Sequence, residues 1–257
     1  MAASMLVKAM FGGSFGCLHT SVSSTGWTIL NDGAASTALP AYATGEALQV
    51  NSSSASDGSA STGARTATVI YINNDGTIGS EVVSITGGGN TALTDTSISR
   101  VLDFYISSYG SAGVSAGTLT VRAVTGPVNR CQILAGRSRA APGRITIPEG
   151  FVGVYKGFSL SNTTVSATAP SKIDYEIEAE INPLTGAYNA GVFTTIDWGA
   201  AGPASGIVGN HSSDPAGGRR IYLPEKTTIH ARAKTDAAGL ITVAGFVYID
   251  LVPNGEV

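Results

Sequence analysis

Residues 66–85 read TATVIYINNDGTIGSEVVSI, and this stretch decides the fold class. Two strand-like runs lie on either side of Asn73–Gly76. Asn, Asp and Gly tolerate the positive φ angles that tight hairpin turns require. The stretch therefore predicts a pair of antiparallel strands joined by a turn at Asn73–Gly76.

Alternation with a period of two residues recurs along the chain, whereas no segment has the apolar spacing of an amphipathic helix. The predicted strands are Thr66–Ile72, Ser80–Ile85, Ser99–Ser107, Thr118–Ala123, Arg144–Ile147, Lys172–Ile181, Thr227–Ala233 and Leu240–Leu251. Short strands punctuated by Gly, Asn and Asp are typical of sandwiches and jelly rolls. We predict an all-β protein of two jelly-roll-like β-sandwich domains with an extended N-terminal arm.

A domain boundary is expected near residue 140, because Gly and Pro interrupt every regular pattern between Thr125 and Gly143. The predicted parts are an N-terminal arm with the region of a first strand (1–40), one sandwich (41–140) and a second sandwich (141–257). Serine-rich Asn51–Thr62 and glycine-rich Gly199–Gly218 are expected to form exposed loops, the second of them long enough for a contact role.

Charged residues make up 13% of the 257 residues, and the net charge is −3. This charge gives no general attraction to nucleic acid or to anionic membranes. No run of about 18 apolar residues predicts a membrane span. Four arginines nevertheless lie close together near the expected boundary: Arg130, Arg137, Arg139 and Arg144. With no aromatic interleaving or recognition helix beside them, we expect protein contacts rather than nucleic-acid contacts.

Two segments of the second half alternate charged and apolar residues. In 172–181 the acidic positions are Asp174, Glu176, Glu178 and Glu180, and in 227–234 the basic positions are His230, Arg232 and Lys234. Like charges about 7 Å apart along one strand face repel each other. Adjacent strands in one sheet would bring the acidic and basic rows together. The alternatives are a Ca²⁺ site, which needs ligands from several directions, and a glycosidase carboxylate pair; a straight row favours neither.

No catalytic or cofactor motif is present. His19, His211 and His230 fit no metal-ligand or nucleophile pattern, and Cys17 and Cys131 have no metal-type spacing. We therefore expect a protein that is not an enzyme and has no cofactor or metal.

The tryptophans, Trp27 and Trp198, leave two interpretations open. With the tyrosines they could form a surface on which sugars stack. Burial in a core or in a subunit interface is the more common outcome and is the one we expect.

Three segments carry a resemblance to a known group of proteins. Residues 51–87 (NSSSASDGSASTGARTATVIYINNDGTIGSEVVSITG) combine a serine-rich loop, TGAR, a DxxG hairpin and an ExVxI strand; the others are 145–155 (ITIPEGFVGVY) and 223–239 (LPEKTTIHARAKTDAAG). The chain resembles structural proteins of tailed-phage virions, of the capsid decoration (cement) and head-fibre type. Residues 1–40 do not share this resemblance.

The resemblance implies a subunit on the exterior of the virion that binds the major capsid protein, stabilises the head shell and forms a homotrimer. It implies no nucleic-acid or membrane partner. An alternative is a receptor-binding or adhesion module of a head fibre or spike that contacts a host glycan. A β-sandwich glycan hydrolase that uses the carboxylates of 174–180 is the third hypothesis.

Overall fold

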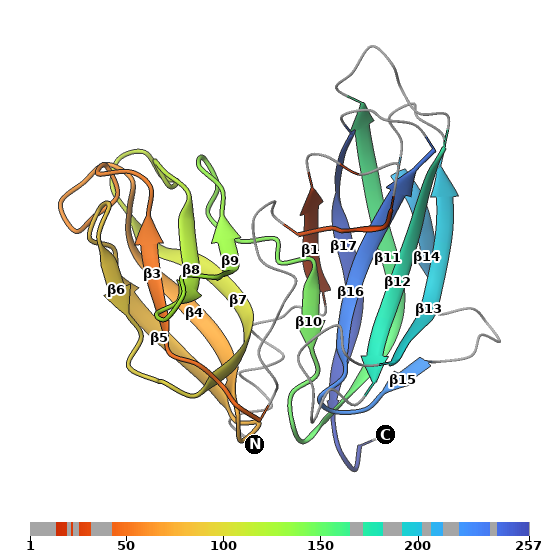
Figure 1. Cartoon of the computed structure of the whole chain (residues 1–257). Coiled ribbons are helices and arrows are strands. Elements are labelled where there is room, and N and C mark those ends of the chain that lie inside the picture. The colour runs from red at the N-terminus through yellow and green to blue at the C-terminus, as the bar shows by residue number, and fades with distance from the viewer. Residues whose placement is uncertain are drawn as a thin grey trace. The chain divides into compact units, whose positions relative to one another are not determined.

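The computed structural model describes residues 14–19, 22, 26–31, 43–164, 172–181, 192–201, 207–212, 221–236 and 241–256. These residues form strands and no helix, so the predicted all-β class is confirmed (Figure 1). The chain divides into two compact units, residues 34–142 with 183–190 and residues 1–33 with 143–182 and 191–257. We call them the seven-stranded unit and the ten-stranded unit, after the strands described in each.

The seven-stranded unit consists of two antiparallel sheets with strand orders β6-β3-β8-β9 and β5-β4-β7. Its strands are β3 (Leu48–Ser52), β4 (Ala64–Asn73), β5 (Ile78–Ser84), β6 (Asn90–Ala92), β7 (Ile98–Tyr109), β8 (Leu119–Ala123) and β9 (Asn129–Ile133). Both sheets contribute to one apolar core; Val69 and Phe104 come from the three-stranded sheet, and Leu119, Val121 and Ile133 from the four-stranded sheet. This is the sandwich arrangement expected for alternating strands.

The hairpin predicted at Asn73–Gly76 joins β4 to β5. The backbone N–H of Gly76 donates to the carbonyl of Asn73 at 2.9 Å, and the N–H of Asn73 donates to the carbonyl of Thr77. Gly76 has a φ of 88°, which a residue with a Cβ rarely adopts. The turn residues thus explain the register of the two strands.

The serine-rich loop after β3 is held in place by the buried carboxylate of Asp57. This carboxylate accepts hydrogen bonds from Ser52 Oγ at 2.6 Å and from the backbone N–H groups of Ala64, Ala116 and Gly117 at 2.8 to 2.9 Å. Burial acts to raise the pKa of Asp57, but these hydrogen bonds outweigh it and lower the pKa below its usual value. The loop is therefore fixed to β4 and to the segment that precedes β8.

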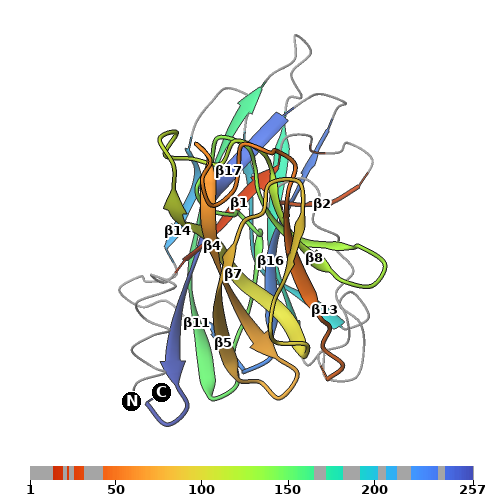
Figure 2. The same ribbon diagram turned by 90° about the vertical axis from the view of Figure 1, so that its left-hand side faces the viewer.

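The ten-stranded unit consists of two antiparallel sheets. Its strands are β1 (Ser14–His19), β2 (Thr28–Ile29), β10 (Arg144–Thr146), β11 (Phe151–Thr164), β12 (Ile173–Ile181), β13 (Val192–Ala201), β14 (Ile207–Ser212), β15 (Ile221–Leu223), β16 (Thr228–Thr235) and β17 (Ile241–Pro253). The β12 sheet has the order β10-β16-β12-β13, with β2 paired to β16. The β17 sheet has the order β1-β17-β11-β14, with β15 paired to β11. The long strands β11 and β17 lie side by side in both views (Figures 1 and 2).

The core of the ten-stranded unit lies between its two sheets. Phe158 and Val247 of the β17 sheet are buried, as are Tyr175 and Ile177 of the β12 sheet. The hydroxyl of the buried Tyr155 on β11 donates to Asp197 Oδ2 on β13 at 2.7 Å, which links the sheets. Burial, followed by this hydrogen bond, raises the pKa of Tyr155.

Two segments have partners that the sequence did not indicate. Residues 14–19 and 28–29, within the segment expected to hold the arm and a first strand, form β1 and β2 and pair with β17 and β16. Gly199–Gly218 is not a continuous loop, since β13 extends to Ala201 and β14 begins at Ile207; residues 202–206 and 213–218 lie outside the described residues. In both places the pairing partner is distant in sequence, so a local pattern does not reveal it.

The division between the units falls between Pro142 and Gly143. Gly143 has a φ of 65°, and a Cβ on it would collide with the backbone carbonyl of Leu30. The carbonyl of Gly143 accepts a hydrogen bond from Ala231 N–H at 3.1 Å. A glycine is therefore required where the chain enters the ten-stranded unit.

Candidate functional site

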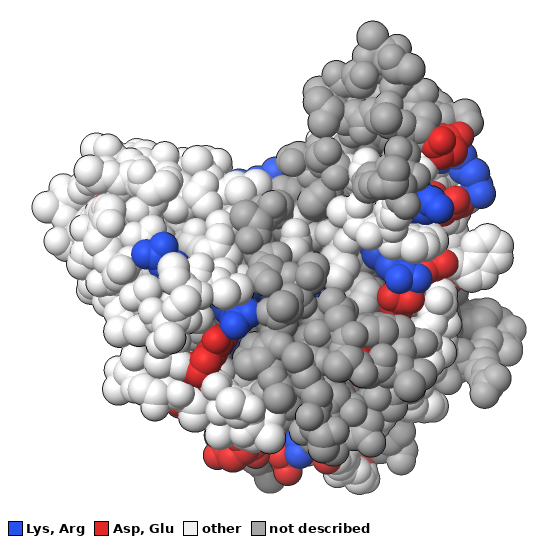
Figure 3. All heavy atoms as spheres, viewed as in Figure 1, with Lys and Arg blue, Asp and Glu red and all other residues white. Residues whose placement is uncertain are grey.

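The charged strands β12 and β16 are neighbours in the β12 sheet and pair antiparallel. The residues that face each other are Asp174–Lys234, Glu176–Arg232 and Glu178–His230. Directly opposed residues lie on the same face of a sheet, so the acidic row faces the basic row. Figure 3 shows Lys and Arg directly beside Asp and Glu on the right-hand part of this view, over these strands; further charged groups lie on the left and along the lower edge.

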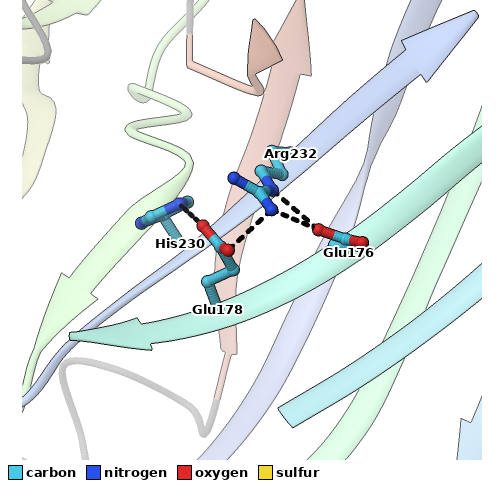
Figure 4. A network of polar contacts seen from close by, with 4 residues as sticks. All are labelled: Glu176, Glu178, His230 and Arg232. Carbon is cyan, nitrogen blue, oxygen red and sulfur yellow. Dashed lines mark hydrogen bonds and ion pairs between the residues drawn. The ribbon is translucent and has the colours of Figure 1, made fainter. Parts of the chain in front are cut away.

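Arg232 joins two carboxylates of the acidic row (Figure 4). Its Nε and Nη2 donate to Oε2 of Glu176 at 2.9 and 2.5 Å, and Nη2 lies 2.7 Å from Oε1 of Glu178. The other oxygen of Glu178, Oε2, lies 3.0 Å from Nε2 of His230. We call Glu176, Glu178, His230 and Arg232 the charge network.

His230 is neutral in this network at pH 7. Burial lowers its pKa below 6.5; the hydrogen bond and charge of Glu178 act to raise it, while Arg232 and Arg144 lower it further. Arg144 is opposite His230 on β10 and is itself buried. The neutral ring, with its proton on Nε2, donates that hydrogen bond to Glu178.

The acidic row passes from exposed to buried along β12. Asp174 is partly exposed and forms an ion pair with Lys172 at 2.7 Å. Glu178 is nearly buried, and Glu180 is fully buried opposite Thr228. Only the end of the row near Asp174 and Glu176 is therefore accessible to a ligand.

Both tryptophans border this accessible end. Trp198 on β13 is directly opposite Glu176, and 71% of its surface is exposed. The ring of Trp27, which is 37% exposed, lies 4.7 Å from Cζ of Arg232. The row Trp198–Glu176–Arg232–Trp27, which we call the tryptophan row, thus crosses three adjacent strands of one sheet face.

The four arginines near the boundary do not form one cluster on a single unit. Arg130 pairs with Glu46, and Arg139 pairs with Asp103 at 2.6 Å, both within the seven-stranded unit. Arg137 is exposed in the same unit, whereas Arg144 is buried in the ten-stranded unit. Arg137 and Arg139 are thus the two with exposed side chains.

The described residues contain no group of three or more His, Cys, Asp or Glu side chains arranged to hold a metal. The two oxygens of Glu178 are bonded to Arg232 and His230, so this carboxylate has its bonding capacity largely occupied. His19 and His211 lie on β1 and β14. Among the described residues, no helix has the length and apolar character needed to cross a membrane.

The outer face of the β17 sheet is apolar where that of the β12 sheet is charged, and sequence reasoning did not identify it. Phe246 and Tyr248, which we call the aromatic strip, are 51% and 38% exposed on β17. Their partners on β11 are Ser159 and Gly157, which are too small to cover them. The available signal was that apolar residues occupy both alternating sets of β17 positions, whereas a strand with one wet face needs only one set.

No protein-family model matches the chain, and the comparison with curated proteins found no match. Among solved structures, faint similarity is found to the VP2 subviral particle of infectious bursal disease virus, with 12% identity over 95% of this chain and 81% of that chain and a TM-score of 0.13. T=1 particles derived from the same virus give 12% identity, 95% and 78% coverage and a TM-score of 0.13. A TM-score this low does not establish a common fold or function.

Proposed function

We propose that this chain is a non-enzymatic structural subunit of a virus particle, a decoration (cement) protein that binds the major capsid protein on the exterior of a tailed-phage head. The observation that carries the proposal is the aromatic strip on the outer face of the β17 sheet. A structural subunit acts through its surfaces, and this is the described face with two adjacent exposed aromatic side chains on one strand.

The aromatic strip has the features of the centre of a protein interface. Phe246 and Tyr248 are two residues apart on one strand, so their side chains stand on the same face. Burying an aromatic side chain removes about 150–250 Å² of surface from water, and aromatic residues are enriched at interface centres. Their cross-strand neighbours on β11, Gly157 and Ser159, are small and do not cover the sides of the two rings.

Polar groups lie near both ends of the strip. Lys156 and Asp250 form an ion pair at 3.4 Å near one end, and the hydroxyl of Ser161 bonds the carbonyl of Ala244 near the other. Tyr222 on β15 is also exposed and lies in the same sheet. An apolar centre with a polar rim is the usual composition of a specific protein interface.

The sequence resemblance to virion proteins supports the particular choice of partner. The segments that carry it form the Asp57 loop with the β4–β5 hairpin, strands β10 and β11, and strands β15 and β16. They occur in both units, so the resemblance does not depend on one local motif. Subunits of such shells assemble with closed symmetry, and we expect a homotrimer.

The proposal is tested with the double variant Phe246→Thr/Tyr248→Thr. Co-sedimentation with purified emptied capsids that lack the protein should be saturable for the unaltered chain and lost for the double variant. Val82→Thr, which removes an exposed apolar side chain from β5 of the seven-stranded unit, is the matched control and should bind normally.

Light scattering measures the mass of the purified protein, which should be that of a trimer. Absence of capsid binding by the unaltered chain contradicts the decoration role. Equal binding by the unaltered chain and the double variant contradicts the assignment of the aromatic strip as the interface.

A further inference from the structure

We propose that the tryptophan row on the outer face of the β12 sheet binds a neutral saccharide. This inference is independent of the capsid-binding proposal, because the row and the aromatic strip lie on different sheets. It assigns a ligand class to Trp198, Glu176, Arg232 and Trp27.

The indole of Trp198 is available for stacking. It stands on β13 at the edge of the sheet order β10-β16-β12-β13 and is 71% exposed. The fold gains little from an apolar side chain left in water to this extent. A flat indole on a sheet matches the apolar C–H face of a pyranose ring, which stacks on aromatic rings.

Glu176 and Arg232 retain unused hydrogen-bonding atoms between the two rings. Their mutual bonds use Oε2 of Glu176 and Nε and Nη2 of Arg232. No described residue bonds Oε1 of Glu176 or Nη1 of Arg232, and Figure 4 shows both atoms directed away from the contacts drawn. An acceptor and a donor held side by side suit adjacent hydroxyl groups of a sugar.

Trp27 completes the site without blocking these atoms. Its ring covers the face of the Arg232 guanidinium, whose N–H donors point outward in the guanidinium plane. The strands β13 and β16, which carry Trp198 and Arg232, are separated by β12, so these two residues are about 10 Å apart at the usual strand spacing. That span accommodates one or two sugar rings.

The charges around the row favour a neutral ligand. Asp174, Glu176 and Glu178 are opposed by Lys172, Arg232 and Lys234, and the buried His230 carries no charge at pH 7. These acidic and basic groups balance, so no net field attracts an acidic sugar. The ion pair between Glu176 and Arg232 also fixes both side chains before a ligand arrives, which reduces the entropy lost on binding.

Tryptophan fluorescence of the full-length chain tests the proposal, because its two tryptophans both lie in the row. The probes are dextran, mannan and galactomannan, with alginate as the acidic comparison. We expect a saturable change of emission with at least one neutral polysaccharide and a weaker one with alginate. Retardation in gels that contain the same polysaccharide measures binding in variants that lack a tryptophan.

Trp198→Ala should weaken saccharide binding about tenfold or more, and Trp198→Phe, which keeps an aromatic ring, should restore part of it. Tyr222→Ala, which removes an exposed aromatic residue from the β17 sheet, is the control and should bind as the unaltered chain does. Trp198→Ala should also leave capsid binding intact, which separates this proposal from the preceding one.

Two results would overturn the saccharide site. One is the absence of any fluorescence change or gel retardation with all three neutral polysaccharides. The other is saccharide binding that is unaffected by Trp198→Ala. A change of oligomer mass in Trp198→Ala without saccharide binding by the unaltered chain would identify the row as a contact between copies instead.

Discussion

The outer faces of the β12 and β17 sheets belong to the same unit and are built from strands of similar pattern, yet their chemistry is opposite. On the β12 sheet the charge network pairs acidic with basic groups across neighbouring strands. On the β17 sheet the aromatic strip stands beside glycine and serine. The fold itself uses the first set of side chains, whereas the second contributes to the fold only in part and leaves apolar surface exposed, which is the surface that we propose a partner covers.

The largest expected effect is that of Glu178→Ala, which breaks the charge network from within. The change leaves the buried His230 and the guanidinium of Arg232 without their shared acceptor. Removing one partner of a buried charge pair costs about 3–5 kcal/mol of unfolding free energy. Urea unfolding followed by tryptophan fluorescence measures it, because both tryptophans belong to the ten-stranded unit. A loss below about 1 kcal/mol would contradict a structural role for the network.

The next effect is a pH dependence of the unfolding free energy, which we attribute to His230 in the β12 sheet. The pKa of His230 is lowered in the folded state, so below pH 6.5 the unfolded chain binds a proton that the folded chain does not. Stability should therefore be full above that pH and fall as the pH decreases, by at most about 1.4 kcal/mol per pH unit.

The matched comparison for this pH dependence is His230→Gln, which keeps a hydrogen-bonding side chain and does not titrate. Urea midpoints measured from pH 7 to pH 5 should fall less steeply in His230→Gln than in the unaltered chain. Parallel pH profiles would show that His19 or His211 accounts for the dependence instead.

A smaller effect is expected from Phe246→Thr/Tyr248→Thr, which alters the other face. Both side chains are exposed to a large extent, and threonine favours strands, so the loss of stability should not exceed about 1 kcal/mol. Capsid binding should nevertheless be lost. A loss of several kcal/mol would mean that the aromatic strip serves the fold and not a partner.

The smallest effect is expected from Asp174→Asn at the exposed end of the acidic row. Its ion pair with Lys172 is accessible to water, and such pairs contribute about 0–1 kcal/mol. Unfolding free energies of Asp174→Asn and Glu178→Ala, measured side by side, show how the contribution of the acidic row to stability increases from its exposed end to its buried end. Equal losses in the two variants would contradict that gradient.

Local patterns were sufficient to predict much of the fold. The hairpin at Asn73–Gly76 and the charged strands at 172–181 and 227–234 follow from side-chain alternation and turn chemistry, which act between near neighbours. The adjacency of the two charged strands was also expected, because basic residues opposite a row of carboxylates relieve the repulsion within it.

Features that depend on distant partners were not predictable in this way. Nothing in residues 14–19 indicates that they pair with 243–248, and nothing in the serine-rich loop indicates that Asp57 is buried among donors from three segments. The exposure of Phe246 and Tyr248 was missed for another reason: apolar residues fill both alternating sets of β17, but an apolar residue on a predicted strand is ordinarily assigned to the core.

The pairing of β1 with β17 has a consequence for the order in which the protein is made. β1, the first described strand of the ten-stranded unit, can pair with β17 only after residues 241–253 have left the ribosome. By then residues 34–142 of the seven-stranded unit have already been synthesised. Domains fold as units during synthesis, so the seven-stranded unit should fold first, while β1 is still unpaired. Any delay in translation between residues 143 and 241 would lengthen the time that β1 remains unpaired and would increase the risk of aggregation.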